Sequence, residues 1–120
     1  MTNDEARAFA QEWITAWNAR DLDAIMSHYA DDVELLSPVA AQLLGLPGGL
    51  VSGKAALRDY FARGLAAFPA LQFQLIDVLA GVGSLVLYYL NQRGTHTAEF
   101  MQLAPDGKVS RVRAHYSVGP

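Results

Sequence analysis

His115 is a candidate for acid–base chemistry, because an imidazole exchanges a proton near neutral pH. It precedes Tyr116 in the last segment of the chain that has a strand pattern. In one register, alternation with Arg111 and Arg113 places His115 on the outer face of a sheet, away from a core. Two interpretations therefore stay open: a catalytic group, or a histidine at an edge or a subunit interface.

Motifs for other common chemistries are missing from the sequence. The three histidines are isolated and lack the H-x-H or H-E-x-x-H spacing of a metal site. The carboxylates Asp31, Asp32 and Glu34 lie in an expected turn, where such residues usually cap and shape the backbone. No G-x-S-x-G motif is present, and the glycines of residues 45–53 lack the lysine–serine pair of a phosphate loop. We expect neither a metal nor a cofactor.

Composition limits the partners. A chain of 120 residues is expected to form one domain, residues 1–120. The absence of cysteine excludes a disulfide framework, and a net charge of −3 argues against binding to nucleic acid. The N-terminal stretch is acidic and does not resemble a signal peptide. The longest apolar run, 85–90, is too short to span a membrane, so a cytoplasmic location is expected.

Hydrophobic periodicity predicts helices early in the chain and strands late. The first helix should begin at a cap on Thr2 or Asn3, the second at Asp21 and the third at Ser52. The three helices are expected to end near residues 18, 29 and 68, and strands are expected over residues 33–37, 71–79, 85–91, 97–103 and 109–118. This grouping predicts an α+β fold rather than alternating α/β units.

Two apolar features allow either a pocket or a packed core. Trp13 and Trp17 share one face of the first helix, where they could line a ligand cavity or simply fill the core. Residues 39–51 form an apolar stretch with three glycines and a proline, and we expect a loop there. Such a loop could be a lid over a hydrophobic pocket, or it could pack on the core or against another subunit.

Assembly is suggested by Leu85–Leu90, which is apolar on both faces of its strand. Antiparallel sheets usually have one solvent-exposed face, and three helices can cover only one side of a curved sheet. We therefore expect a homodimer that forms through the outer face of the sheet.

The sequence resembles a known family. A first helix containing tryptophan, N-A-R-D-L-D at 18–23, Y-A-D-D-V at 29–33 and a strand that ends at Pro38 are similar to the nuclear transport factor 2-like superfamily. Within it, the SnoaL-like polyketide cyclases and ketosteroid isomerases are the most similar, and G-K-A-A-L-R-D-Y-F at 53–61 also fits. The resemblance covers nearly the whole chain. It implies a cone-shaped, curved, mostly antiparallel sheet wrapped by three helices, and a homodimer, but many different reactions occur on this fold.

The resemblance to ketosteroid isomerases is incomplete at the catalytic positions. Their general base corresponds to Ser37, which has no neighbouring base, and their first-helix tyrosine corresponds to Trp13, which can only donate a hydrogen bond. The third catalytic group, a protonated carboxyl, corresponds to Glu99. We therefore do not expect steroid isomerisation as the specific reaction.

The position of Glu99 depends on the last hairpin. If Asp106 and Gly107 form a two-residue turn, Glu99 lies opposite Ala114 and near the residues Met101, Val112 and Tyr116. If Pro105 joins them in a three-residue loop with a bulge, Glu99 faces Arg113 and could form an ion pair. In the first case, burial among apolar groups should raise the pKa of Glu99.

These observations favour binding of a small hydrophobic molecule inside the cone. As an enzyme, the protein would catalyse isomerisation, cyclisation, dehydration or hydrolysis without a cofactor. Glu99 would be the acid or base, with His115 as a second candidate. The alternative is a ligand carrier or a dimerisation and partner-binding module without catalysis. The expected ligand-binding residues are Trp13, Trp17, Ser37, Phe61, Met101, Val112 and Tyr116.

Overall fold

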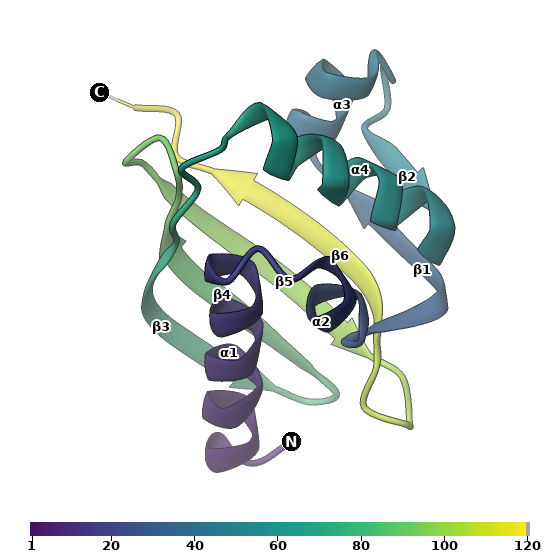
Figure 1. Ribbon diagram of the computed structural model, residues 1–120. Helices are drawn as coiled ribbons and strands as arrows, with labels where there is room; N and C mark the ends of the chain where they lie inside the picture. The colour runs from purple at the N-terminus through teal and green to yellow at the C-terminus, as the bar shows by residue number, and fades with distance from the viewer. Residues whose placement is uncertain (120) are drawn as a thin grey trace.

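The computed structural model describes residues 1–119 as a strongly curved sheet with helices packed on its concave side (Figure 1). The helices are α1 (Asn3–Asn18), α2 (Leu22–Met26), α3 (Pro38–Leu44) and α4 (Lys54–Ala67). The strands are β1 (Tyr29–Leu36), β2 (Leu50–Ser52), β3 (Gln74–Gly81), β4 (Ser84–Leu90), β5 (His96–Leu103) and β6 (Val109–Tyr116).

The six strands form one sheet in the order β2-β1-β6-β5-β4-β3. Among residues 1–119, only β1 and β6 run parallel, and the other neighbours are antiparallel. Helices and strands are segregated, so the prediction of an α+β fold with a curved, mostly antiparallel sheet is confirmed. The number of helices differs from the prediction: the described part of the chain forms four, where the sequence indicated three.

The additional helix lies in the stretch 39–51 that was expected to be a loop. Ser37 begins α3 as its N-cap, accepting a hydrogen bond from the Val39 N–H at 3.1 Å. Pro38 occupies the first turn, where its missing N–H costs nothing. Gly45 ends the helix in a left-handed conformation with φ 65°. After a short connection, the chain forms β2, in which Val51 pairs with Leu35 of β1.

Two predicted helix starts are confirmed and one is wrong. Thr2 forms a capping box with Glu5 at the start of α1, and Asp21 caps α2 through a hydrogen bond from the Ala24 N–H. The N-cap of α4 is Gly53 with φ 91° and no side-chain hydrogen bond, whereas Ser52 belongs to β2. Ser52 cannot cap α4 because it pairs with Glu34 of β1 as part of the sheet.

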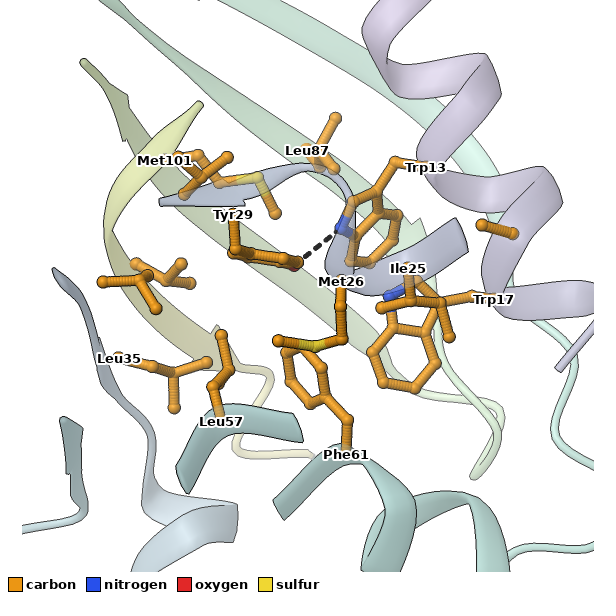
Figure 2. Packing of buried hydrophobic residues seen from close by; sticks show 14 of the residues in the cluster. Trp13, Trp17, Ile25, Met26, Tyr29, Leu35, Leu57, Phe61, Leu87 and Met101 are labelled. Carbon is orange, nitrogen blue, oxygen red and sulfur yellow. Dashed lines mark hydrogen bonds between the residues drawn. The ribbon is translucent and has the colours of Figure 1, made fainter. Parts of the chain in front are cut away.

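The core fills the space between the helices and the concave face of the sheet (Figure 2). Along β4, alternate side chains face it: Leu85, Leu87 and Tyr89 are buried, whereas Val86 and Tyr88 are only partly buried. The side chains Trp13, Tyr29, Leu57 and Met101 meet at its centre, each at most 2% exposed. Within residues 1–119, no helix combines the length and the hydropathy needed to cross a membrane.

Candidate functional site

A cavity of about 90 Å³ opens at one end of the concave face, between α1, α3, α4 and the strands β1, β4, β5 and β6. Its walls are mostly aromatic and aliphatic, with few polar groups, as is usual for small-molecule sites. The lining includes Trp13, Trp17, Ser37, Phe61, Tyr89 and Glu99.

Glu99 faces this cavity because of a bulge in the last hairpin. Ala104 and Lys108 pair across the three-residue turn that begins at Pro105, with the Ala104 N–H donating to the Lys108 carbonyl at 2.7 Å. Leu103 pairs with Val109, but Gln102 pairs with Arg111, so Ser110 is the extra residue of a bulge.

The bulge shifts the register of every later pair, and Glu99 lies opposite Ala114 rather than Arg113. The three-residue turn therefore forms, yet the pairing matches the alternative that was expected from a two-residue turn. Arg113 points to the opposite face of β6 and forms no ion pair with Glu99.

Glu99 is only 7% exposed, and its carboxyl has a tyrosine as its partner. The Tyr89 hydroxyl donates a hydrogen bond to Glu99 Oε2 at 3.0 Å. Burial raises the pKa of Glu99 from 4.5 to about 7, and the hydrogen bond from Tyr89 opposes this shift. The carboxyl can therefore exist as an acid or as a base near neutral pH.

Tyrosine hydroxyls surround this carboxyl. Burial is the largest cause of a raised pKa at Tyr60, Tyr89 and Tyr116, and it brings the pKa of Tyr60 to about 12. The nearby Glu99 raises these three pKa values further. Ser37 lies close to Tyr60 and Tyr116 and lowers the pKa of both. All these hydroxyls stay protonated near neutral pH, so they offer neutral O–H donors around one titratable carboxyl.

The two indoles have different hydrogen bonding. Trp13 Nε1 donates to the Tyr29 hydroxyl at 2.9 Å, which directs this N–H into the core rather than toward a ligand (Figure 2). Trp17 Nε1 is buried and has no partner among residues 1–119. The Trp17 ring packs edge-on against Phe61, with ring centroids 4.8 Å apart. Both tryptophans line the cavity and also belong to the core cluster, so the two interpretations of these side chains coincide.

Helix α3 closes one side of the cavity, which Val39 and Leu43 line. Facing α3, Gly64 of α4 also lines the cavity, and a Cβ added at this glycine would meet no atom within 4 Å. Because Val39 and Leu43 are of moderate size and Gly64 has no side chain, space remains between the two helices.

The motif N-A-R-D at 18–21 holds a further wall of the cavity. Asn18 exchanges two hydrogen bonds with the backbone of Phe73, at 2.9 and 2.7 Å. Arg20, in a left-handed conformation with φ 57°, donates to the carbonyls of Leu65 and Phe68 at the end of α4. The segment between Phe68 and Phe73, which lines the cavity, is therefore fixed to the end of α1.

Three of the expected site residues lie away from the cavity. Met101 and Val112 are fully buried in the core further along the sheet and do not line it. His115 is exposed on the convex face, where its Nδ1 lies 3.1 Å from the Arg113 carbonyl oxygen. The structure therefore brings Glu99 together with Trp13, Trp17, Ser37, Phe61 and Tyr116, but not with His115.

The sequence analysis did not identify Tyr60, Tyr89 and Asn91 as lining residues. For Tyr89 a signal was present, because it alternates in phase with Leu85 and Leu87. Within residues 1–119, no group of three or more histidine and carboxylate side chains could hold a metal ion.

A family model of the SnoaL-like domain matches residues 10–118. The chain is similar to the crystal structure of a SnoaL-like protein of unknown function from Burkholderia thailandensis, with 42% identity, a TM-score of 0.94 and coverage of 97% of each chain. No curated protein sequence matches it.

More distant structures share the fold alone. One is a protein of unknown function with a cystatin-like fold from Methylobium petroleophilum, with 11% identity, a TM-score of 0.78 and coverage of 100% of this chain and 80% of that one. Another is SalBIII, an epoxide hydrolase/cyclase-like enzyme with a role in pyran ring formation in the polyether salinomycin. It has 20% identity, a TM-score of 0.71 and coverage of 98% of this chain and 95% of that one.

Proposed function

The chain belongs to the SnoaL-like domain family, and we propose that it binds a small, largely apolar molecule in its cavity, with an oxygen of that molecule beside Glu99. The observation that carries this proposal is a buried carboxyl in an aromatic cavity without a cationic partner. A buried carboxyl without a cation beside it destabilises a fold unless something offsets its burial, and an interaction with a polar group of a ligand would offset the burial of Glu99.

The reaction that fits this arrangement is proton transfer. As a neutral acid, Glu99 would donate a hydrogen bond to a carbonyl or ether oxygen of the ligand, and as a carboxylate it would remove a proton. The Tyr60 and Tyr116 hydroxyls would orient the oxygen, while Trp17 and Phe61 would contact the apolar part. Isomerisation, cyclisation, dehydration and hydrolysis all use such a step, and the cyclase-like SalBIII supports this range for the fold.

The experiment that tests the proposal is a thermal-melt screen against polyketide, terpenoid, steroid and fatty-acid panels, near pH 5 and near pH 8. A ligand at a hundred times its Kd adds about 2.7 kcal/mol, which raises the Tm by several degrees. We expect a hit whose shift depends on pH, and a loss of that dependence in Glu99→Gln.

The control is Gly64→Leu, which places a larger side chain at the cavity without a predicted clash at Cβ. This variant should fold and lose the ligand. A hit that persists unchanged in Gly64→Leu would mean that binding occurs elsewhere. The absence of any hit from a folded protein would favour a module that binds partners without a small ligand.

We also propose a homodimer formed through the convex face of the sheet. Val86, Tyr88 and Phe100 are partly buried on this face, and Leu79, beside Val86, is 52% exposed. These apolar side chains support a partner surface on a second copy. Sizing chromatography at micromolar concentration should give a dimer, and an elution volume of a monomer would contradict the proposal.

A further inference from the structure

The turn between β4 and β5 is held in one shape by Asn91, which is buried and lines the cavity. Asn91 Oδ1 accepts hydrogen bonds from the Arg93 N–H at 3.0 Å and from the N–H and hydroxyl of Thr95 at 3.3 and 3.1 Å. Its Nδ2 donates to the Thr97 hydroxyl at 2.9 Å. The position of Arg93 is therefore fixed relative to the cavity wall.

The Arg93 side chain extends over an aromatic ring of the cavity. Its Cζ lies 5.6 Å from the centroid of Phe68, and Phe68 lines the cavity. Stacking on an aromatic face holds a guanidinium in place and leaves its N–H groups directed outward from the edge. None of the ion pairs among residues 1–119 includes Arg93.

Arg93 also lines a second hollow of about 160 Å³, which adjoins the cavity. The two spaces share Val39, Asn91, Gln92 and Tyr116 in their walls. The second hollow is more polar, with Gln42, Thr95 and Ser117 in its lining. A molecule could therefore place an apolar part among the aromatic rings and a polar end in this hollow.

The charges of the combined space lie at separate places. Glu99 is the only charged residue that lines the cavity, and Arg93 is the only one that lines the adjoining hollow, among residues 1–119. A planar guanidinium held at such a position matches a carboxylate through two parallel hydrogen bonds.

We infer that the ligand is a small apolar molecule that carries a carboxylate, and that Arg93 binds this group in the adjoining hollow. The inference rests on the proposed function, because it assumes that the cavity is a ligand site. It makes Arg93 a specificity-determining residue, and it assigns the apolar part and the acid of the ligand to different spaces.

The test uses a matched pair of probes, 3-phenylpropionate and 3-phenylpropionamide, which differ in charge and little in shape. Both tryptophans of the chain line the cavity, so their two indole N–H signals in a ¹H–¹⁵N spectrum report binding there. The titration is made near pH 6, where the probe acid is ionised and Glu99, with a pKa of about 7, is mainly neutral.

We expect the acid to bind about tenfold more tightly than the amide, because a hydrogen bond to a charged group adds roughly 1.4 kcal/mol or more. In Arg93→Gln this preference should disappear, with the affinity for the amide unchanged. Arg7→Gln is the control, since Arg7 is an exposed arginine of α1 and does not line either space. This control should keep the preference for the acid.

Equal binding of acid and amide by the wild-type protein would overturn the role of Arg93 and leave the proposed function intact. A preference that persists in Arg93→Gln would also overturn it. If neither probe moves the indole signals at millimolar concentration, the inference falls, and the thermal-melt screen then decides separately whether the cavity binds any ligand.

Discussion

The concave face of the sheet has two ends, and they are packed differently. At one end Val33, Met101, Val109 and Val112 are fully buried and fill the space under α2 and α4. At the other end, β5 and β6 carry the inward side chains Glu99, Ala114 and Tyr116, Ser37 directly follows β1, and a cavity remains. Two residues along a strand, from Met101 to Glu99, separate a packed core from a candidate site.

This difference shows that the pocket depends on what the inward positions carry rather than on the fold itself. Ala114 is small, so it cannot fill the space opposite Glu99. The helices above this end also leave room, since Gly64 has no side chain. The filled end should therefore determine stability, and the open end should determine binding.

The strongest way to test this division is to compare Met101→Ala with Leu43→Ala. Met101 is fully buried, so its truncation leaves a cavity and should lower the free energy of unfolding by about 2–5 kcal/mol. Leu43 is 37% exposed and lines the open end. Its truncation should lower the free energy of unfolding by about 1 kcal/mol or less, and it should change ligand affinity instead. Urea unfolding measures both values, and equal losses would contradict the division.

The pH dependence of stability isolates Glu99 at the open end. Its pKa is about 7 in the folded protein and 4.5 as the reference for the unfolded chain. Below pH 4.5 Glu99 is protonated in both the folded and the unfolded state, and its protonated form makes its full contribution to the free energy of unfolding. Between 4.5 and 7 only the unfolded state ionises, so stability falls, by about 3 kcal/mol in total, and then levels off.

Glu99→Gln removes this titration. We therefore expect the difference in unfolding free energy between wild type and Glu99→Gln to change by about 3 kcal/mol between pH 4 and pH 8, in favour of the variant at high pH. Asp32→Asn, at an exposed position of β1, is the control and should follow the wild type. Parallel pH profiles of wild type and Glu99→Gln would show that the carboxyl is not buried as described.

The smallest expected effect concerns Gly64→Ala. A glycine inside a helix costs roughly 0.5–1 kcal/mol relative to alanine, and a Cβ at this position meets no atom within 4 Å. The variant should therefore be more stable by about that amount and should bind cavity ligands more weakly. Ala62, two residues before Gly64 on α4, offers a comparison because it does not line the cavity, and Ala62→Gly should lower stability without affecting binding. A less stable Gly64→Ala would contradict this account.

Much of the fold was predictable because the sequence patterns of its helices and strands are local and extend over several residues. The stripe of α1, the caps Thr2 and Asp21 and the alternation of β4 each repeat over several residues. The resemblance to the SnoaL-like family is confirmed by the family match and supplied the position of Glu99. Helix α3 was missed because it is only seven residues long and lies in a glycine-rich stretch. Its start depends on Ser37, which directly follows β1 and caps α3.

The candidate site was less predictable, because it depends on contacts between distant segments. Nothing local indicates that Asn18 and Arg20 hold the backbone between Phe68 and Phe73. Turn chemistry also could not determine the register of the last hairpin. The turn has three residues, which alone would place Glu99 opposite Arg113, but the bulge at Ser110 restores the pairing of Glu99 with Ala114. The spacing of Val109 and Val112 is consistent with the bulge. They are three residues apart, so in a regular strand they would face opposite sides, yet both are buried in the core.

The bulge at Ser110 also determines how sequences of this family should be aligned. A relative that lacks the residue corresponding to Ser110, near the start of β6, would form a regular hairpin, and the residue corresponding to Ala114 would still face the carboxyl. The gap in such an alignment belongs at Ser110 rather than in the turn that begins at Pro105. Placed there, it keeps the site in register, and a change in hairpin length can occur in evolution without moving Glu99.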